Sequence, residues 1–432
     1  MNDGEGRFSM RLPVKPVNPI ASNAAGSYRL DPLRWHCEQP ESLARYLGGR
    51  LRVLSIVPFP VLPLSHGGRV RAYRLAVGLA HAGATVHLAC PWHPSLPFRP
   101  FIRDDITIRP FRLVAGVLPA ILGDRLVPPL MQLSLQPFTW GPRRLLRQCA
   151  DYDLVEFHFC AYASWMKRLT TVTRVVYSAH NVELDYARSI SPNRLSGMVA
   201  RRIGTLEREA VRASDLVVAC TEADGRRLAE LYGEPSRLAV VPNGFEEADI
   251  EDMQRVPREE ARQALGLMPE ELVILFVGGR ALHNRRAVQF LEHELLPALT
   301  RPARLLIAGQ CASKRREGRV VALGFVERLA PLLAAADLAV NPVTSGSGSN
   351  IKLPEYVAAG LPVVTTPLGL RGYEAFAHLV TVAELDRFAG AIRDLPRQSR
   401  RLPAVSHLGW SALGRRLHET YAASVARARG PD

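Results

Sequence analysis

The sequence predicts an α/β protein whose chain forms two doubly wound domains, one after the other. Residues 51–90 read as an apolar strand, a turn with a glycine pair, a helix and a second strand, and residues 272–308 repeat that order. Short apolar runs alternate with helical patterns as far as residue 366, which is typical of parallel sheets covered by helices. A chain of 432 residues is long enough to give each of two domains its own core.

Strands are predicted from short apolar runs, and helices from apolar residues three or four positions apart. The first domain is expected to have strands at 51–57, 85–90, 153–159, 174–179, 216–221 and 238–241, and helices at 69–82, 207–213 and 222–231. The second is expected to have strands at 272–277, 304–308, 320–326, 337–341 and 363–366, and helices at 329–336 and 351–359. A last helix is predicted at 406–427, and the acidic, polar stretch 246–258 is predicted to be the linker.

The composition is that of a globular protein with a strong basic excess. Lys and Arg number 55 against 41 Asp and Glu, a formal net charge of +14, which favours nucleic acid, an anionic membrane face or phosphorylated substrates as partners. No nucleic-acid motif accompanies the charge, so we expect no nucleic-acid partner. The sequence has no apolar run of about 20 residues and no N-terminal signal core, and its six scattered Cys lack metal-type spacing. We therefore expect a cytoplasmic protein with reduced cysteines and no transmembrane helix.

Residues 92–147 contain two apolar stretches, at 114–123 and 127–135, which are interrupted by Pro and bordered by Arg. Apolar surface rimmed by Arg is typical of a helix that lies at an anionic membrane interface. In that case the segment would face a lipid-linked acceptor at the inner face of the cell membrane. The alternative, ordinary core helices of the first domain, stays open.

The most informative stretch runs from Ser345 to Thr366 and begins with six small residues. A short helix is predicted next, with Pro354 in its first turn and Gly360 as its stop, followed by a buried strand. A Gly/Ser loop that leads into a helix N-terminus presents uncovered backbone N–H groups, which suit an anion such as a diphosphate. The loop residues expected at this site are Gly346, Ser347, Gly348, Ser349 and Asn350.

Two charged residues, Lys352 and Glu355, lie three positions apart and therefore share one face of this helix. Lys352 would neutralise phosphate, and Glu355 would accept hydrogen bonds from ribose hydroxyls. The alternative is a solvent-exposed Lys–Glu pair, which stabilises a helix by only about 0.2–0.5 kcal/mol. The loop before the helix and the strand after it favour a site for a nucleotide diphosphate.

Other candidate residues directly follow predicted strands, where open α/β sheets bind their ligands. Gly67 and Gly68 would let the backbone approach a ligand closely, although a plain tight turn is the alternative. His180 could hydrogen-bond a sugar hydroxyl or a phosphate, or it could instead cap the loop that follows it. In the second domain, Arg280 follows Gly279 in the corresponding turn and could pair with diphosphate oxygens.

The stretch Ser345–Thr366 resembles the donor site of the family 4 (group 1) retaining glycosyltransferases, which have the GT-B fold. The resemblance rests on a Gly-rich loop, a Lys, a Glu on a short helix and the sequence G-L-P-V-V that follows. Family members often carry a further Glu eight positions before this one, where the present chain has Ser347. The chain therefore resembles the branch of the family that has G-S-G before the Lys and lacks the first Glu.

The resemblance assigns roles to residues elsewhere in the chain. It implies that Gly67 and Gly68 lie near the donor diphosphate and the acceptor. It also implies that His180 contributes to the active site and that a basic residue, here Arg280, serves the diphosphate. His180, Arg280 and Lys352 are then the expected catalytic residues.

The resemblance further implies the overall organisation. Phe325 and Val326 would lie beside the nucleotide base, although core packing is the more common position for such residues. The sequence P-N-G at 242–244 would form the turn that leaves the first domain. Two Rossmann-like domains would face each other across a cleft, and the last helix would cross back to the first. The expected parts are a loosely ordered arm at 1–48, an acceptor-binding domain at 49–250, a nucleotide-sugar-binding domain at 251–405 and the returning helix at 406–432.

The implied reaction moves a hexosyl group from a nucleotide-diphosphate sugar to an acceptor hydroxyl, with retention at the anomeric carbon. A saccharide or lipid-linked acceptor is expected, in the synthesis of cell-surface polysaccharide or glycolipid. No cofactor and no metal are expected, since the sequence has no paired-Asp motif that would hold a metal. Two alternatives remain: a catalytically silent nucleotide-binding or scaffold protein of a polysaccharide assembly complex, and a nucleotide-sugar epimerase.

Overall fold

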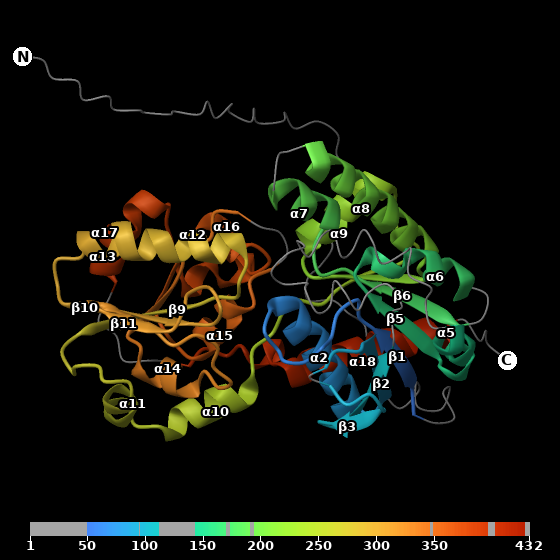
Figure 1. The fold of residues 1–432 in the computed structure, drawn as a ribbon, viewed down its shortest axis with the longest axis horizontal. Helices are drawn as coiled ribbons and strands as arrows, with labels where there is room; N and C mark the ends of the chain where they lie inside the picture. Colours follow the sequence, from blue (N-terminus) through green and yellow to red (C-terminus); the bar gives the residue numbers. More distant parts are fainter. Residues whose placement is uncertain are drawn as a thin grey trace, which may run out of the picture. The chain divides into compact units, whose positions relative to one another are not determined.

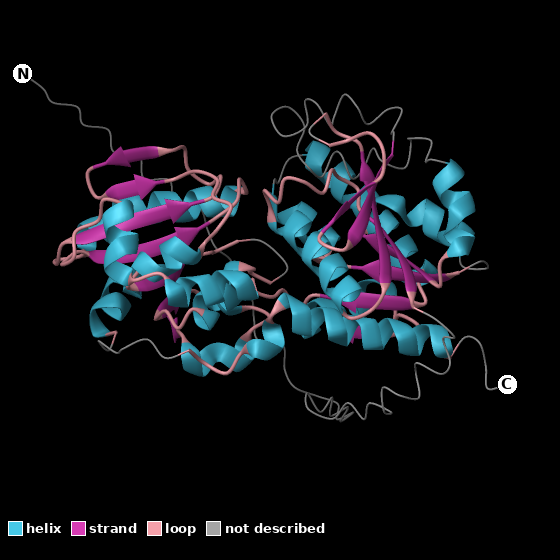
Figure 2. Cartoon of the chain, turned by 90° about the horizontal axis from the view of Figure 1, so that it is seen from below, coloured by secondary structure: helices cyan, strands magenta, loops and turns pink. Residues whose placement is uncertain are grey.

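The structure is a computed structural model of the chain. It describes residues 50–94, 96–111, 143–169, 173–190, 194–345, 349–395 and 402–427. Over these ranges the chain forms two sheets, each mainly parallel and each flanked by helices (Figure 1, Figure 2). The predicted α/β fold class is confirmed. The arm expected at 1–48 lies outside the described residues, and the domain boundaries expected at 250 and 405 stay predictions.

The first sheet has the strand order β3-β4-β2-β1-β5-β6-β7-β8. Its described pairings are parallel except that of β3 with β4. Strand β1 lies between β2 and β5, so the strand order reverses there, and ligands of doubly wound folds bind beside such a point. The strands are β1 (Arg52–Ile56), β2 (Thr85–Pro91), β3 (Phe101–Arg103), β4 (Ile106–Phe111), β5 (Leu154–His158), β6 (Arg174–Ser178), β7 (Leu216–Ala219) and β8 (Leu238–Val240).

The second sheet has the order β11-β12-β10-β9-β13-β14-β15, and its one antiparallel pairing among the described strands joins β11 and β12. Strand β9 occupies the central position that β1 has in the first sheet, between β10 and β13. The strands are β9 (Leu272–Val277), β10 (Ala303–Ala308), β11 (Arg315–Glu317), β12 (Val320–Ala322), β13 (Leu338–Asn341), β14 (Val363–Thr365) and β15 (Thr381–Val382).

Helices cover both faces of each sheet, because both faces are apolar. We call the first sheet with its helices the first region, and the second sheet with its helices the second region. The first region contains α2 (Gly67–His81), α5 (Arg143–Gln148), α6 (Ala163–Leu169), α7 (Glu183–Ile190), α8 (Arg194–Ala213) and α9 (Glu222–Tyr232), with 3₁₀ turns at Cys149–Asp151 and Cys160–Tyr162. The second contains α10 (Glu247–Arg255), α11 (Arg258–Ala264), α12 (Leu282–Phe290), the π-helical segment η4 (Leu291–Leu295), α13 (Leu296–Ala298), α14 (Ala330–Ala335), α15 (Lys352–Ala358), α16 (Pro367–Leu370) and α17 (Phe388–Asp394), with 3₁₀ turns at Glu374–Leu379 and Leu385–Arg387. A 3₁₀ turn at Ser406–Leu408 then leads into the last helix, α18 (Trp410–Ala426).

Alternate residues of one strand pack into different cores, as the pleat of a strand requires. In β1, Val53 packs in the core that contains α2 and α18, whereas Leu54 packs in the core beneath α6, α8 and α9. In β9, Ile274 packs against α12 and α17, whereas Leu275 faces α14 and α15. Figure 1 shows α12 and α17 on one side of the second sheet and α14 on the other.

The last helix, α18, returns to the first sheet and packs along α2, as expected. At its entry the backbone pairs with the chain that leaves β8: Phe245 N donates to Leu408 O at 3.2 Å, and Trp410 N donates to Phe245 O at 3.2 Å. The two helices approach closely because glycines face each other where they cross. A Cβ at Gly78 would lie 2.9 Å from the Cα of Gly414.

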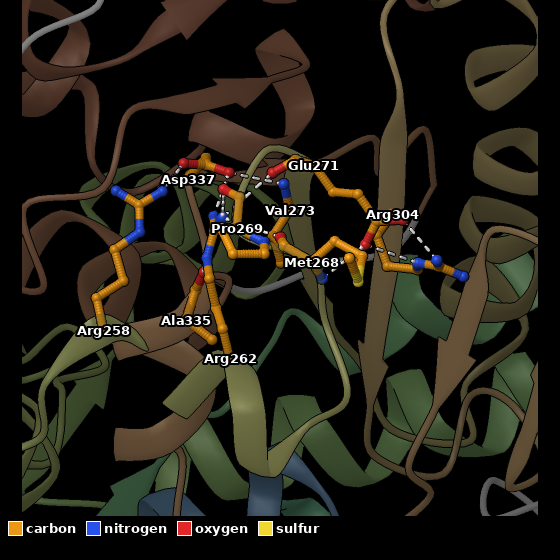
Figure 3. Close-up of polar contacts among 9 residues, drawn as sticks. All are labelled: Arg258, Arg262, Met268, Pro269, Glu271, Val273, Arg304, Ala335 and Asp337. Carbon is orange, nitrogen blue, oxygen red and sulfur yellow. Dashed lines mark hydrogen bonds and ion pairs between the residues drawn. The ribbon is translucent and has the colours of Figure 1, made fainter. Parts of the chain in front are cut away.

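A polar cluster ties helix α11 to the amino ends of the second sheet's strands (Figure 3). The guanidinium of Arg262 is buried and donates to Ala335 O at 3.0 Å, to Pro269 O at 2.6 Å and to the Asp337 carboxylate at 2.6 Å. Asp337 also accepts from the backbone N–H of Val273 at 2.7 Å. Because its polar groups are hydrogen-bonded to one another, the cluster has a structural role. The candidate site lies at the opposite ends of the same strands, which are their carboxyl ends.

The structure contains elements that the prediction lacks, among them α6, α7, α11, α17, β11 and β15, and it differs in other places as well. Residues 247–255 of the predicted linker form helix α10, whose Ile250 and Met253 are buried in the same core as residues of α14. Residues 101–111, within the Arg-rich segment 92–147, form strands β3 and β4, which no prediction anticipated. Helix α8 begins at Arg194, well before the helix predicted at 207–213. The apolar stretches 114–123 and 127–135 lie outside the described residues, so their two interpretations stay predictions.

The described cysteines, Cys90, Cys149, Cys160, Cys220 and Cys311, are all buried and form no disulfide. Across the part of the chain that the structure describes, none of the helices is long and apolar enough to span a bilayer.

Candidate functional site

Turns at the carboxyl ends of β1 and β9 lie against each other. A Cβ at Gly67, at the start of α2, would lie 3.0 Å from the side chain of Ile351, which precedes α15. A Cβ at Gly279 would lie 3.7 Å from the carbonyl oxygen of Ser65. The structure therefore brings together three predicted elements, which are the glycine pair, the Gly278–Arg280 turn and the Lys352 helix.

Gly67 and Gly68 form the first turn of α2 and not a separate tight turn. His66 caps this helix, with its Nδ1 accepting from Arg69 N at 3.4 Å. The first N–H groups of a helix have no intrahelical partner, so α2 presents a positive end at this point. A Cβ at Gly68 would lie 3.1 Å from the ring of Phe159, so a larger residue would press on that ring.

Lys352 begins α15 and is held by Asn284 of α12 and Phe276 of β9. Its Nζ donates to Asn284 Oδ1 at 2.8 Å and lies 4.5 Å from the centre of the Phe276 ring, a cation–π distance. Burial lowers the pKa of Lys352 to about 8. Among the described residues Lys352 makes no ion pair with Glu355, so the alternative of a simple surface Lys–Glu pair is not what the structure contains.

Glu355 occupies the next turn of the same helix, in an acidic environment. Burial, together with the negative charges of Asp249 and Glu246, raises the pKa of Glu355 to about 8, although Arg74 opposes them. Arg74 lies 2.6 Å from Glu246 in an ion pair. A ligand hydroxyl that donates to Glu355 would favour its carboxylate form, so this side chain can recognise a diol.

The loop expected to bind the anion is described only in part. Gly346, Ser347 and Gly348 lie outside the described residues. Ser349 is held by Asn243, whose Nδ2 donates to its carbonyl oxygen at 3.0 Å and to its Oγ at 2.9 Å. Asn350 donates from Nδ2 to the carbonyl oxygen of Gly369 at 3.1 Å. Both residues therefore fix the end of the loop just before α15.

His180 is buried directly after β6, as predicted, and touches two residues of the β5 end. Its Nε2 lies 2.8 Å from Nδ1 of His158, and its ring lies 4.2 Å from the ring of Phe159. Burial, followed by the positive charges of His158, Arg71 and His66, holds the pKa of His180 well below its ordinary value. His180 is therefore a neutral imidazole that can donate or accept one hydrogen bond at each nitrogen.

Phe159 is a site residue that the sequence did not indicate. Its φ of 66° and ψ of 163° belong to a region that non-glycine residues rarely adopt. This backbone ends β5 and directs the ring between Gly68 and His180. Strain of this kind is concentrated at functional sites, and no sequence pattern reports a positive φ at a phenylalanine.

The other predicted residues lie in nearby turns. Arg280 is exposed in the turn after β9. Phe325 follows β12 with 46% of its surface exposed, whereas Val326 is partly buried against the core. Core packing, the alternative for both residues, therefore applies to Val326 and not to Phe325.

Asn284 is a further residue of the candidate site, and its contacts are not evident from the sequence. It is buried in α12, accepts from Lys352 and donates to the carbonyl oxygen of Gly279 at 3.2 Å. It therefore joins the β9 turn to α15. The sequence L-H-N-R-R contains Asn284, but the helical pattern alone does not indicate that its amide contacts Lys352. Among the described residues, no group of three or more His, Cys, Asp or Glu side chains is arranged to hold a metal ion.

Comparison with known proteins bears on the same two regions. The family model described as Glycosyltransferase Family 4 matches residues 65–249, and that of Glycosyl transferases group 1 matches residues 271–398. The chain is 28% identical over 279 residues to a D-inositol 3-phosphate glycosyltransferase of Rhodococcus erythropolis, covering 58% of this chain and 61% of that protein. A protein of the same description from Nocardia farcinica is 28% identical over 339 residues, covering 68% of this chain and 71% of that one.

Solved structures resemble the chain in fold. A sucrose-phosphate synthase from Thermosynechococcus elongatus gives a TM-score of 0.62 at 16% identity, over 88% of this chain and 98% of the other. A UDP-forming trehalose-phosphate synthase from Burkholderia vietnamiensis gives 0.60 at 17% identity, over 89% and 99%. The Anabaena protein HepE in complex with UDP-glucose gives 0.54 at 16% identity, over 88% and 98%. The two family matches span most of the chain, and the folds agree with them: the chain belongs to the glycosyltransferases of the GT-B fold, with a family 4 region followed by a group 1 region.

Proposed function

We propose that the protein transfers a hexosyl group from a nucleoside-diphosphate sugar to an acceptor hydroxyl, with retention of configuration and without a metal ion. The observation that carries this proposal is the placement of Lys352 and Glu355 on successive turns of α15, beside the glycine turn of α2. One side chain suits a diphosphate and the other suits a ribose. A single nucleotide diphosphate bound along α15 would satisfy both.

The chemistry of the proposed reaction needs positive charge where the leaving diphosphate forms. Lys352 supplies an ammonium group that Asn284 holds in place. The N-terminus of α2 supplies backbone N–H groups at Gly67 and Gly68, and Arg280 supplies a guanidinium in the adjoining turn. With these groups in place, the leaving phosphate could assist attack from the same face of the sugar, which retains the configuration.

Similar proteins indicate which donor and which acceptor to test first. HepE was solved with UDP and with UDP-glucose, which makes a uridine donor the first to test. The curated relatives are described as D-inositol 3-phosphate glycosyltransferases, which makes that cyclitol phosphate one acceptor to test. The other acceptors are saccharides and lipid-linked saccharides of cell-surface polysaccharide or glycolipid synthesis, with the protein in the cytoplasm or at the inner face of the membrane.

The first experiment is calorimetric titration of the protein with UDP and with GDP. We expect one nucleotide to bind, and Glu355→Ala to lose about 1.5–3 kcal/mol of binding free energy, as for hydrogen bonds to a charged group. Glu327→Ala is the matched control, because Glu327 is an exposed carboxylate of the same region. If neither nucleotide binds the unmodified protein, the proposed function is wrong.

The second experiment measures turnover of the sugar nucleotide that the binding result selects. Transfer to an added acceptor, with the anomeric configuration of the product read by NMR, would support the proposal. Binding without turnover would instead favour a silent scaffold protein. Isomerisation of the sugar nucleotide in the absence of acceptor would favour an epimerase.

A further inference from the structure

A buried row of polar side chains extends from His180 into the first sheet. Ser55 on β1 donates from Oγ to Glu156 Oε2 at 3.0 Å, and its Oγ lies 2.8 Å from His158 Nε2. Nδ1 of His158 in turn lies 2.8 Å from His180 Nε2. Ser55 is the direct strand partner of Glu156, and Glu156 and His158 are two positions apart on β5, so the three side chains share one face of the sheet. The function described above uses none of the three.

The burial of this row requires an opposite charge for Glu156. Glu156 is 1% exposed and His158 is fully buried, and an isolated buried carboxylate is strongly unfavourable. Nε2 of His158 lies 3.4 Å from Glu156 Oε2. Tyr421 of α18 also lies against Glu156, but its hydroxyl carries no charge. His158 is therefore the group that can compensate the carboxylate, as an imidazolium.

The electrostatics of Glu156 agree with this assignment. Burial alone would raise the pKa of Glu156, but the charge of His158 and the donors of His158 and Ser55 lower it to about 2. Glu156 is thus ionised at neutral pH. Because the charge of His158 is what lowers this pKa, the assignment rests on the geometry, in which the buried carboxylate of Glu156 lies 3.4 Å from His158 Nε2.

The hydrogens of Ser55 and His158 determine the tautomer of His180. The single hydroxyl hydrogen of Ser55 goes to Glu156, so Nε2 of His158 must carry its own hydrogen toward Ser55. An imidazolium also carries a hydrogen on Nδ1, and here that hydrogen points to Nε2 of His180. His180 is neutral, because burial and the neighbouring positive charges of His158 and Arg71 disfavour its cationic form. Its Nε2 therefore accepts, and its own hydrogen is on Nδ1.

We propose that Glu156 and His158 are positioning residues that hold His180 in the Nδ1–H tautomer, so that it donates a hydrogen bond to an oxygen of the bound donor sugar or acceptor. The proposal rests on the proposed function, because it assigns a direction to the hydrogen bond that His180 makes in that site. In the opposite arrangement, with His158 neutral, Nδ1 of His180 would have a lone pair and would repel an oxygen that is not a donor. The buried pair of Glu156 and His158, which contacts His180 and not the substrate, thus determines the kind of atom that His180 can bind.

The test is ¹⁵N NMR of the full chain labelled at histidine, without ligand. The nitrogen shifts of an imidazole separate a protonated from an unprotonated ring nitrogen, and His180→Gln identifies the signals of His180. We expect the hydrogen of His180 on Nδ1. A hydrogen on Nε2 of His180 in the unmodified protein would overturn the proposal, and this result does not need an active enzyme.

Glu156→Gln keeps the shape of the side chain and removes its charge. Without the negative charge of Glu156, the imidazolium form of His158 is no longer favoured. We therefore expect His180 to change to the Nε2–H tautomer. We also expect kcat for sugar transfer to fall about a hundredfold, similar to the loss of one transition-state hydrogen-bond donor, with the Kd for the nucleotide unchanged. An unchanged tautomer together with an unchanged kcat would overturn the proposal.

Glu207→Gln is the matched control. Glu207 is an equally buried glutamate of the first region, but its carboxylate accepts from the backbone N–H groups of Glu183 and Leu184 at 2.7 and 3.1 Å and does not contact the histidines. We expect it to alter stability without changing the tautomer of His180. The two proposals fail separately: absence of nucleotide binding contradicts the proposed function, whereas the wrong tautomer in a protein that binds nucleotide contradicts only this inference.

Discussion

Asn243, which follows strand β8 of the first sheet, donates hydrogen bonds to both the carbonyl oxygen and the hydroxyl of Ser349, at the end of the Gly/Ser loop of the second region. Asn243 is itself held from two sides. Arg71 of α2 donates to its Oδ1 at 3.1 Å, and Tyr373 donates from its hydroxyl to the Asn243 carbonyl oxygen at 3.0 Å. The P-N-G turn, which the sequence marks only as the exit from the first domain, is also the anchor of the loop that leads into α15.

Removal of this anchor should weaken both folding and nucleotide binding. We expect Asn243→Ala to lower the free energy of unfolding by about 1–3 kcal/mol, because Arg71 is buried and loses one acceptor while Ser349 loses its donor. The nucleotide Kd should rise, because the start of α15 is no longer fixed. Chemical denaturation and calorimetry measure the two effects.

A double-mutant cycle of Asn243→Ala with Ser349→Ala measures the contribution of the hydrogen bond from Asn243 to the Ser349 hydroxyl. Ser349→Ala removes the hydroxyl but keeps the backbone carbonyl that Asn243 also bonds, so it should have the smaller effect. We expect a coupling energy of at least about 0.5 kcal/mol between the two substitutions. Strictly additive effects on nucleotide binding would show that the hydrogen bond from Asn243 to the Ser349 hydroxyl does not contribute to it.

The sequence predicts the sheets well because their strands depend on local patterns. Strands such as β1 and β9 are short apolar runs that both faces of a parallel sheet bury, and the turns after them contain the glycines that mark the sites. Lys352 and Glu355 can also be recognised as candidate site residues from the sequence, because they lie on a short helix that follows a loop of small residues.

The remainder of the site depends on contacts between distant residues. Asn284 reaches Lys352 across 68 positions of sequence, and no periodicity within α12 indicates this. Glu156 and His158 lie in a strand that reads as mostly apolar, so only their unusual position, as charged residues inside a buried run, could signal a role. The helix at 247–255 reads as a linker because its polar composition masks two buried side chains, Ile250 and Met253.

The acid side of the pH profile of nucleotide binding should depend on Glu355. Its pKa is about 8 in the empty site, and ribose hydroxyls that donate to the carboxylate would lower that value in the complex. The contribution of Glu355 is then full above pH 8 and is lost as the pH falls from about 8 toward the pKa of the complex, by up to tenfold per pH unit.

Glu355→Gln tests this dependence. The amide still accepts hydrogen bonds but does not titrate, so its Kd should change less below pH 8 than that of the unmodified protein. The variant also corrects for titration of the nucleotide phosphate, which is the same in both titrations. Parallel pH profiles for the two proteins would show that Glu355 does not bind as a carboxylate.

The alkaline side of the same profile should depend on Lys352. Its pKa is about 8 in the empty site, and a bound diphosphate would raise it, since an opposite charge favours the ammonium form. The contribution of Lys352 is therefore full below pH 8 and declines as the pH rises from about 8 toward the pKa of the complex. Lys352→Arg keeps the positive charge at all these pH values, so its affinity should not decline, although its absolute value will be lower because the contact with Asn284 is altered. An equal decline in both proteins, measured by calorimetry above pH 8, would exclude Lys352 as the diphosphate ligand.

The crossing of α2 and α18 should tolerate no side chain at its glycines. A Cβ at Gly78 would lie 2.7 Å from the carbonyl oxygen of Trp410, and both atoms belong to rigid helices, so the helices would have to separate. Overpacking of this kind is unfavourable by about 1–3 kcal/mol, which exceeds the helix-propensity gain of about 1 kcal/mol that Gly→Ala provides inside a helix. Gly78→Ala should therefore lower the free energy of unfolding, measured by denaturant titration. A Cβ at Gly390, in α17, would meet no neighbouring atom within 4 Å. Gly390→Ala should therefore raise the free energy of unfolding by the helix-propensity gain alone. If Gly78→Ala proved as stabilising as Gly390→Ala, the close approach of α18 to the first sheet would be refuted, and with it the return of the last helix.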